Sequence, residues 1–301
     1  MTIFHVIVLA IVQGLAELLP VSSSAHVVVA EKLMGLDPSS PQMTLLLVML
    51  HTGTMFAVIA YFWRQWRETY FASADAFKRV AVRLVWATAL TGVVGDALIK
   101  VIEHTLFKGV PKAQIEDLFG RLDLIAPALA AAGVLILIAG LREGRAGDAE
   151  AAEAASLTRR PSGSVTMGQA GWMGFVQGLA LPFRGFSRSG STISTGMLVG
   201  ASKERAERFS FALAVVLTPA VVAQEGLRLL KATHAAAATG APIDLHGTVV
   251  MSLLGAVFSF LAGLVALKWL SSWLEHGRWY LFGIYCSVAS GVVFWLHTRG
   301  Y

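Results

Sequence analysis

The stretch Val12–His26, VQGLAELLPVSSSAH, decides how this chain is expected to fold. It begins like the middle of a membrane helix and then presents a carboxylate, a proline, three serines and a histidine. Its first five residues return at Val176, where they open the stretch VQGLALPFRGFSRSGSTIS. Because hydrocarbon cannot satisfy polar groups, both copies must be buried in protein or lie beside a water-filled cavity.

The composition is that of a membrane protein. Of the 301 residues, 55% are hydrophobic and 14% are charged, and the mean hydropathy is +0.65. The net charge of +5 is modest and lies mostly in short connecting loops, so nothing indicates nucleic-acid binding. Six apolar stretches have about the 20 residues that a membrane-spanning helix needs: Thr44–Trp63, Leu84–Val101, Leu122–Leu141, Phe209–Leu227, Thr248–Leu267 and Trp279–Leu296.

The apolar run at Ile3–Ala16 is expected to belong to the mature protein and not to a secretory signal. No basic residue precedes it, and it continues directly into Glu17 and Pro20. The single cysteine, Cys286, lies inside the last apolar stretch. A disulfide within the chain and a metal cluster built on thiolates are therefore excluded, and the residue is read as a small apolar filler.

Loop charge predicts the orientation. The segment Arg64–Arg83 carries five basic and two acidic residues, and a short basic loop of this kind stays cytoplasmic. Counting crossings from there places Glu103–Arg121 outside and residues 143–167 inside. The latter segment is rich in Ala, Glu, Gly, Arg and Ser and is predicted to be a flexible cytoplasmic linker. Both termini then lie outside.

The two polar stretches do not fit as ordinary spans, because each is short and broken by proline or glycine. We expect re-entrant helix pairs over residues 3–33 and 168–202, each with its non-helical tip buried in protein. The chain is thus predicted to be an all-α integral membrane protein with about six transmembrane helices plus two re-entrant pairs. Because the pairs enter from opposite sides, residues 1–142 and 168–301 would form an inverted-topology repeat with its site near the midplane.

The first tip is acidic. A carboxylate at the centre of a membrane helix costs roughly 2.5 to 3.5 kcal/mol on insertion scales, so Glu17 needs a divalent cation or an arginine as its partner. Gln13 lies four residues earlier on the same helical face, so Gln13 and Glu17 are predicted to address one metal ion together. The alternative is a polar pair that fills a gap or caps the helix.

The serines that follow stand where a second helix is expected to begin. Ser22 and Ser23 there could bind an anion through the free amides and the positive end of the helix dipole, or could only cap the helix. His26 lies one turn beyond Ser23, within expected reach of its hydroxyl. Its neighbours Glu17, Ser22 and Ser23 set His26 apart from a lone histidine, which is usually only a satisfied polar residue. Four other histidines are read as ordinary polar residues: His5, His104, His234 and His297.

The second tip is basic. Arg188 lies between Ser187 and Ser189, Gly190 lets the backbone close around a ligand, and Thr192 follows. A planar guanidinium surrounded by hydroxyls and free amides suits a phosphate group. The alternative is that Arg188 only neutralises the carboxylate of the first tip.

The two motifs together resemble those of the undecaprenyl pyrophosphate phosphatase family, the bacitracin-resistance type called BacA or UppP. QGLAELLPVSSSAH is similar to the family pattern (E/Q)GxxExLPVSSxxH, and GFSRSGSTIS to PGxSRSGxT, and the resemblance covers nearly the whole chain. It implies hydrolysis of undecaprenyl pyrophosphate to undecaprenyl phosphate and phosphate, with a divalent cation such as Mg²⁺ or Ca²⁺. It also implies the bacterial inner membrane, a site facing the periplasm and bacitracin resistance. The partners would be the polyprenyl lipid and the bilayer, with a homodimer as one option.

The resemblance also assigns roles by position. It implies that Glu17, Ser23, His26 and Arg188 are catalytic, that Glu17 and Gln13 hold the metal, and that Arg188 binds phosphate. On that basis Ser23 is predicted as the nucleophile and His26 as its base, while attack by His26 itself or by a water that it activates stays open. The hydroxyls and amides of the two tips add further predicted phosphate contacts: Ser22, Ser187, Ser189, Gly190 and Thr192. Two departures stand out. Gln13 removes one charge from the metal site, and Arg184 replaces the expected proline in a stretch one residue longer than the pattern. Arg184 is either an additional phosphate contact or a changed loop entrance.

A rival hypothesis belongs to another functional class. Inverted repeats with broken helices are a transporter architecture, so the chain could instead move undecaprenyl phosphate across the membrane as a transporter or flippase. The serine and histidine beside Glu17 favour hydrolysis, because transport of a phosphate does not require them. The two departures also leave open a catalytically silent lipid-binding relative.

Overall fold

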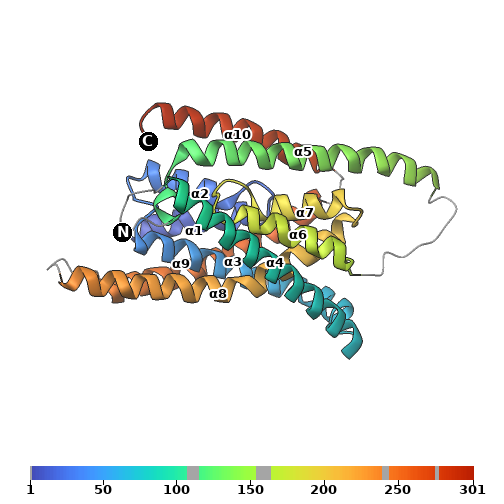
Figure 1. Ribbon diagram of the computed structural model, residues 1–301, viewed down its shortest axis with the longest axis horizontal. Coiled ribbons are helices and arrows are strands. Elements are labelled where there is room, and N and C mark those ends of the chain that lie inside the picture. The colour runs from blue at the N-terminus through green and yellow to red at the C-terminus, as the bar shows by residue number, and fades with distance from the viewer. Residues whose placement is uncertain (1, 107–114, 154–163, 239–243, 275–277) are drawn as a thin grey trace.

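The computed structural model describes residues 2–106, 115–153, 164–238, 244–274 and 278–301 (Figure 1). All regular structure in these ranges is helical, with ten α-helices and one short 3-10 helix, Ile115–Leu118. The α-helices are α1 Ile3–Glu17, α2 Ser23–Leu33, α3 Pro41–Thr69, α4 Ala74–Leu106, α5 Leu122–Glu153, α6 Met167–Ala180, α7 Arg188–Leu198, α8 Lys203–Ala238, α9 Leu245–Leu274 and α10 Tyr280–Thr298.

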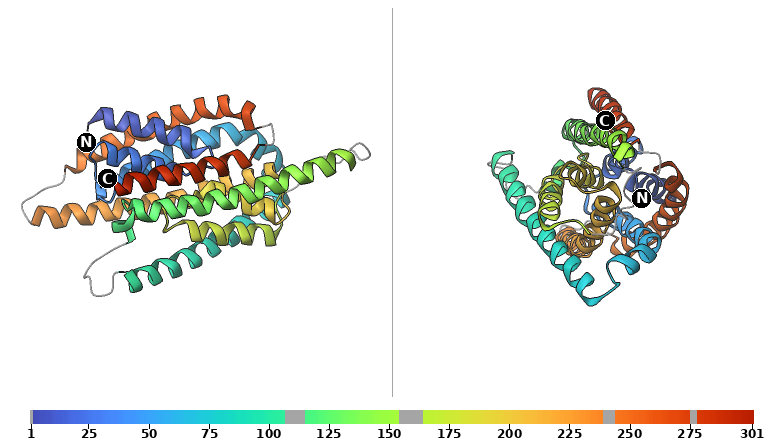
Figure 2. Two further views of the ribbon diagram at one scale, coloured as in Figure 1. Left: turned by 90° about the horizontal axis from the view of Figure 1, so that it is seen from above. Right: turned by 90° about the vertical axis from the view of Figure 1, so that its right-hand side faces the viewer.

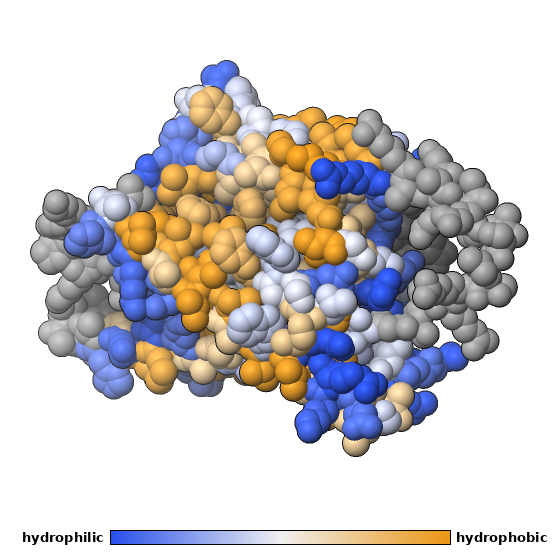
Figure 3. Space-filling model, turned by 45° about the vertical axis from the view of Figure 1, so that its right-hand side comes forward, coloured by the Kyte–Doolittle hydropathy of each residue, from blue (hydrophilic) through white to orange (hydrophobic). Residues whose placement is uncertain are grey.

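Six of these helices are long and apolar enough to cross a membrane: α3, α4, α5, α8, α9 and α10. The prediction of an all-α protein with six such helices is therefore confirmed. Many of their large apolar side chains point outward, among them Val85, Val265 and Val288. On the face shown in Figure 3, hydrophobic residues form a broad band between two hydrophilic ends, as a surface in contact with lipid requires.

Both chain termini lie at the same end of the helix bundle, as Figures 1 and 2 show. This agrees with an even number of crossings. Helix α5 runs on to Glu153, so it extends into the segment 143–167 that the sequence predicts as a linker. Residues 154–163 of that segment lie outside the described residues.

The two halves of the chain repeat one order of helices, two short and then three long. Helix α1 packs against α9, the fourth helix of the other half, and α6 packs against α4 in the same way. The glycine of each VQGLA copy lies at these contacts. A Cβ on Gly14 would be 2.4 Å from the Cβ of Ala262, and one on Gly178 would be 2.9 Å from the carbonyl oxygen of Thr91. The repeated pentapeptide thus allows the first helix of each half to approach a helix of the other half closely.

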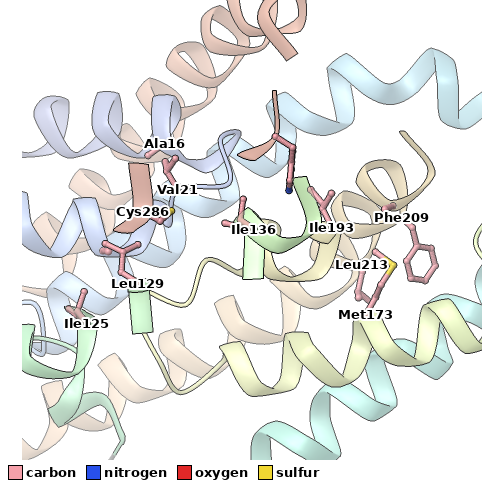
Figure 4. Packing of buried hydrophobic residues seen from close by; sticks show 14 of the residues in the cluster. Ala16, Val21, Ile125, Leu129, Ile136, Met173, Ile193, Phe209, Leu213 and Cys286 are labelled. Carbon is pink, nitrogen blue, oxygen red and sulfur yellow. The ribbon is translucent and has the colours of Figure 1, made fainter. Parts of the chain in front are cut away.

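The largest buried apolar cluster joins the two broken helix pairs. Figure 4 shows Ala16 and Val21 beside Cys286 at the first break, with Ile193 of α7 and Phe209 of α8 further along the same cluster. The sulfur of Cys286 lies 3.4 Å from the carbonyl oxygen of Pro20 and is fully buried. Close packing on both sides fixes the two breaks relative to each other.

Candidate functional site

The first break separates α1 from α2. Helix α1 ends at Glu17, and α2 begins at Ser23 after Ser22, whose φ of 64° lies in the left-handed region. A residue with a side chain adopts this conformation at a cost that the surrounding structure must offset. The short turn directs the backbone from α1 into α2 and leaves the Ser23 side chain facing the end of α1.

The second break has the same construction and meets the first. Ser187, with φ of 44°, precedes the first residue of α7, Arg188. The hydroxyl of Ser187 accepts a hydrogen bond from the backbone N–H of Gly190 and another from that of Ser22, both at 3.2 Å. A Cβ on Gly190 would lie 3.1 Å from the carbonyl oxygen of Pro20, so this glycine lets the two tips come together.

Glu17 is the centre of the site. It is only 7% exposed, and its Oε1 forms an ion pair with the Nη2 of Arg188 from the opposite half of the chain. Its Oε2 accepts hydrogen bonds from the Ser23 hydroxyl and from Gln13 Nε2, the latter at 2.8 Å. A buried carboxylate is stable only with such charge-assisted partners. The predicted face shared by Gln13 and Glu17 and the neutralising contact of Arg188 are both present.

His51 is a member of the site that the sequence analysis missed. It lies on α3, with its Nε2 3.3 Å from Glu17 Oε2 and its Nδ1 2.8 Å from the carbonyl oxygen of Leu47. The available signal was its place in the apolar stretch LLLVMLHTGTMF, because an ionisable residue inside a membrane helix is a functional candidate by default.

His26 does not contact Ser23 as the sequence analysis expected. Its Nδ1 lies 2.8 Å from the carbonyl oxygen of Ser22, and its Nε2 lies 2.7 Å from the hydroxyl of Tyr285, whose ring stacks on it. Because a carbonyl only accepts, Nδ1 donates to it, and Nε2 forms the second hydrogen bond, with the Tyr285 hydroxyl. The Ser23 hydroxyl is held instead by the carboxylate of Glu17, which as an anion is the stronger acceptor.

A cavity of about 200 Å³ opens beside the two tips. Its polar lining consists of Arg184, Arg188, Ser24, His51, Ser187, Thr44 and Glu225, and apolar residues, including some of α3 and α8, complete the wall. The guanidinium of Arg184 lies 4.0 Å from the centre of the Phe119 ring, which supports it from one side. Arg184 thus lies on the cavity wall, and both readings of its role stay open.

Other predicted phosphate contacts lie behind the wall of this cavity. Thr192 is fully buried, and its hydroxyl donates to the carbonyl oxygen of Arg188 at 2.8 Å and bonds to Ser210. Ser22, Ser23, Ser189 and Gly190 are also buried and do not line the cavity. The described contacts of Thr192 therefore tie α7 to α8, and phosphate binding by its hydroxyl stays a prediction.

Apolar space adjoins the polar site between α3 and α8. A small cavity of about 20 Å³ leads from Glu17 and His51 past Met55, Val58 and Phe211. A second cavity of about 290 Å³ lies between α3, α8 and α9 and is almost wholly apolar, with Leu45, Met49 and Leu253 in its wall.

In the described part of the chain, no group of three or more His, Cys, Asp or Glu residues converges in a way that could hold a metal ion. The donors gathered around Glu17 are of mixed type: one carboxylate, the imidazole of His51 and the amide of Gln13. Gln13 is fully buried, and its Oε1 has no hydrogen-bond partner among the residues that the structure describes.

Comparison with known proteins gives one family and many relatives. The family model described as bacitracin resistance protein BacA matches residues 6–293. Undecaprenyl-diphosphatase 2 of Acinetobacter baylyi is 58% identical over 295 residues, which cover 97% of each chain. Undecaprenyl-diphosphatase 2 of Burkholderia thailandensis is 34% identical over 96% of this chain and 95% of its own. The undecaprenyl-diphosphatase of Desulfatibacillum aliphaticivorans is 35% identical over 96% of each.

Proposed function

The chain belongs to the family of bacitracin resistance protein BacA, and we propose that it removes the terminal phosphate of undecaprenyl diphosphate within the membrane. The product, undecaprenyl phosphate, is the carrier lipid that cell-wall synthesis reuses. The observation that carries the proposal is the contact set of Glu17, which accepts a hydrogen bond from Ser23 of its own half and is paired with Arg188 of the other half. Arg188 in turn lines the cavity of about 200 Å³. The names of the relatives give the transporter hypothesis no support.

The diphosphate occupies the cavity lined by Arg184 and Arg188 in this proposal. Arg188 exchanges Glu17 for an oxygen of the terminal phosphate, and Arg184 contacts the phosphate group nearer the lipid. Guanidinium groups suit this task because each presents a fork of N–H donors to a tetrahedral anion. Ser187, with the first turn of α7 at Ser189 and Gly190, holds Arg188 at the positive end of the α7 dipole.

Ser23 is the nucleophile in this scheme. Its hydroxyl already points at Glu17, which takes the proton as Oγ forms a bond to the terminal phosphorus. The anhydride P–O bond breaks, its electron pair goes to the bridging oxygen, and undecaprenyl phosphate leaves. Water then releases inorganic phosphate from the phosphoserine, while Arg188 and Arg184 stabilise the charge that spreads over the transferred group.

His26 acts as a positioning residue in this scheme and not as the base. Its hydrogen bond to the carbonyl of Ser22 supports the left-handed turn that aims Ser23 at Glu17. The hydroxyl of Tyr285 anchors the far side of the ring. Loss of His26 should therefore loosen the turn without removing a group that transfers a proton.

A divalent cation belongs to the proposal, and the residues present fit one. The carboxylate of Glu17 and the amide oxygen of Gln13, with the oxygens of the diphosphate itself, are ligands that Mg²⁺ and Ca²⁺ accept. Gln13 faces Glu17 through Nε2 at 2.8 Å, and a half-turn of its amide would bring Oε1, which has no partner in the described residues, beside the carboxylate. A bound cation would neutralise negative charge on the diphosphate.

We also propose that the two halves form an inverted-topology repeat in which α1–α2 and α6–α7 are re-entrant pairs. The exchanged packing of α1 on α9 and α6 on α4, and the left-handed serine at each break, support this arrangement. The chain would lie in the bacterial inner membrane with the cavity open to the periplasm. The prenyl tail would lie along the apolar cavities beside α3 and α8.

Labelling of single cysteines tests this orientation. In a Cys286→Ala background, an impermeant thiol reagent applied to intact cells should modify Thr298→Cys and spare Ser73→Cys. Both residues are exposed, and the turn that holds Ser73 lies at the end of the bundle opposite the termini. The reverse pattern would overturn the periplasmic site and leave the proposed reaction untouched.

The reaction itself is tested with purified protein and a soluble C15 prenyl diphosphate. Inorganic phosphate should appear in proportion to protein, and a chelator should suppress its release. Protein that binds the lipid but releases no phosphate with any divalent cation would remove the enzyme proposal.

A further inference from the structure

The two ring nitrogens of His51 both face oxygen atoms that can accept a hydrogen bond, and a neutral imidazole can donate to only one of them. Leu47 offers a carbonyl oxygen to Nδ1 at 2.8 Å, and a carbonyl accepts but never donates, so Nδ1 carries a proton. In the neutral ring Nε2 then presents a lone pair, and the atom that it faces at 3.3 Å is an oxygen of Glu17. Two acceptors face each other at this point, which is unfavourable unless a positive charge lies between them.

The same arrangement is typical of a histidine that ligates a metal. Such a residue almost always donates its other ring N–H to a backbone carbonyl or a carboxylate, which fixes the ring and its tautomer. Two ligand atoms that each lie about 2.1 Å from one cation, at a right or tetrahedral angle, are about 3.0 to 3.4 Å apart. The observed 3.3 Å between His51 Nε2 and Glu17 Oε2 falls in this range.

Gln13 could supply a third metal ligand. Gln13 is fully buried, and its Oε1 has no partner in the described residues, while its Nε2 lies 2.8 Å from the same Oε2 of Glu17. A half-turn of the amide exchanges its oxygen and nitrogen, and the side chain then fills almost the same volume because the two atoms are similar in size. The turned amide would present an oxygen to the space beside Glu17.

We propose that His51 is a protein ligand of the cation, completing a set with Glu17 and Gln13. The inference rests on the proposed function, since His51 lines the diphosphate cavity and Glu17 lines the small cavity that shares His51 and Arg188 with it. It also changes the class of cation. An imidazole ligand favours Mn²⁺, Co²⁺ or Zn²⁺ over the Mg²⁺ or Ca²⁺ that an all-oxygen set accepts.

Visible absorption of bound Co²⁺ tests the ligand set without measuring turnover. Full-length protein, purified in detergent and stripped with chelator, is titrated with Co²⁺ in the presence of methylene diphosphonate, a diphosphate that cannot be hydrolysed. The protein should give a Co²⁺ spectrum with imidazole ligation. His51→Gln should lose that spectrum and bind Co²⁺ at least about 10-fold more weakly.

His234→Gln is the matched control. His234 also places Nδ1 near the carbonyl four residues earlier on its helix, at 2.7 Å from Leu230, but it is exposed and lies outside both cavities of the polar site. It should bind Co²⁺ as the parent does. A second variant, Gln13→Glu, should bind Co²⁺ about 10-fold more tightly, because it adds an anionic ligand to the set.

The outcomes separate this inference from the proposed function. A parental Co²⁺ spectrum in His51→Gln, or the absence of any Co²⁺ spectrum in the parent, would show that a proton and not a metal ion lies between His51 and Glu17. Phosphate release with Mg²⁺ in the same preparations would then support the proposed phosphatase activity and reject His51 as a metal ligand. Loss of phosphate release in every preparation would reject the phosphatase instead.

Discussion

The two copies of VQGLA have the same sequence and different surroundings. Each leads to a break, a left-handed serine and a new helix of 11 residues. In the first copy Gln13 donates to Glu17, whereas in the second Gln177 lies 3.5 Å from the hydroxyl of Thr91, away from the cavity. The position that holds Glu17 in the first copy holds Leu181 in the second.

This difference shows that the repeated residues build the scaffold and that the residues after them carry the chemistry. The repeated glycines bring each first helix against a helix of the other half. The two tips carry complementary charges, the carboxylate of Glu17 on the first and the guanidinium of Arg188 on the second. Neither half contains the whole site, so a variant in one copy can be compared with the other copy or with a matched residue elsewhere.

Glu17→Gln should have the largest effect and lower phosphate release by at least about 1000-fold, because Ser23 and Arg188 lose their shared acceptor. The variant should remain abundant in the membrane. Glu68→Gln, which alters an exposed pair with Arg64, is the control and should be unaffected. Steady-state phosphate release measures both. Retained activity with unchanged cation dependence would make Glu17 a structural residue.

Ser23→Ala should reduce turnover to nearly the same level while the affinity for the prenyl diphosphate persists. Residues that act as one unit are non-additive, so Ser23→Ala combined with Glu17→Gln should be little worse than Glu17→Gln alone. His26→Ala should cost only about 10-fold, as expected for a positioning residue. A dead His26→Ala beside an active Ser23→Ala would instead assign the attack to His26 or to water.

Arg188→Lys should weaken both substrate affinity and turnover, by about 100-fold in kcat/KM, since a point charge replaces a fork of donors. Arg205→Lys is the control, because Arg205 donates to Ser202 at 3.0 Å and lines neither cavity of the polar site. A change in KM alone would mean that Arg188 binds substrate and does nothing further in the reaction.

Gln13→Ala and Gln177→Ala should have the smallest effects on phosphate release. They alter the same position of VQGLA in the two copies, so they compare the copies directly. Both glutamines are fully buried, so each variant should lower the free energy of unfolding by about 1 to 3 kcal/mol. Only Gln13→Ala should also slow phosphate release, by about 10-fold, since only Gln13 contacts Glu17. Equal kinetic effects would show that the two copies contribute alike.

Much of the fold could be predicted from the sequence, because span length and hydropathy follow directly from the thickness of the bilayer. The sequence left two alternatives for Arg188: it binds phosphate, or it only neutralises Glu17. Charge balance identifies Arg188 as a partner of Glu17, but it does not decide whether the two are paired when no ligand is bound. The expected contact between His26 and Ser23 was wrong, because helical spacing places a side chain on one face of the helix but does not decide which hydrogen-bond partner it contacts. His51 was missed because its partner lies 34 positions earlier in the sequence and only packing brings the two together.

The central claim is that one phosphate is handled by residues from both halves of the chain. Release of radiolabelled phosphate by the parent, Glu17→Gln, Arg188→Lys and their double variant tests it most directly. If the two residues work on one phosphate, the double variant should be little slower than Glu17→Gln alone. Losses that multiply, to about 100000-fold, would mean that the two tips act independently and would contradict the account.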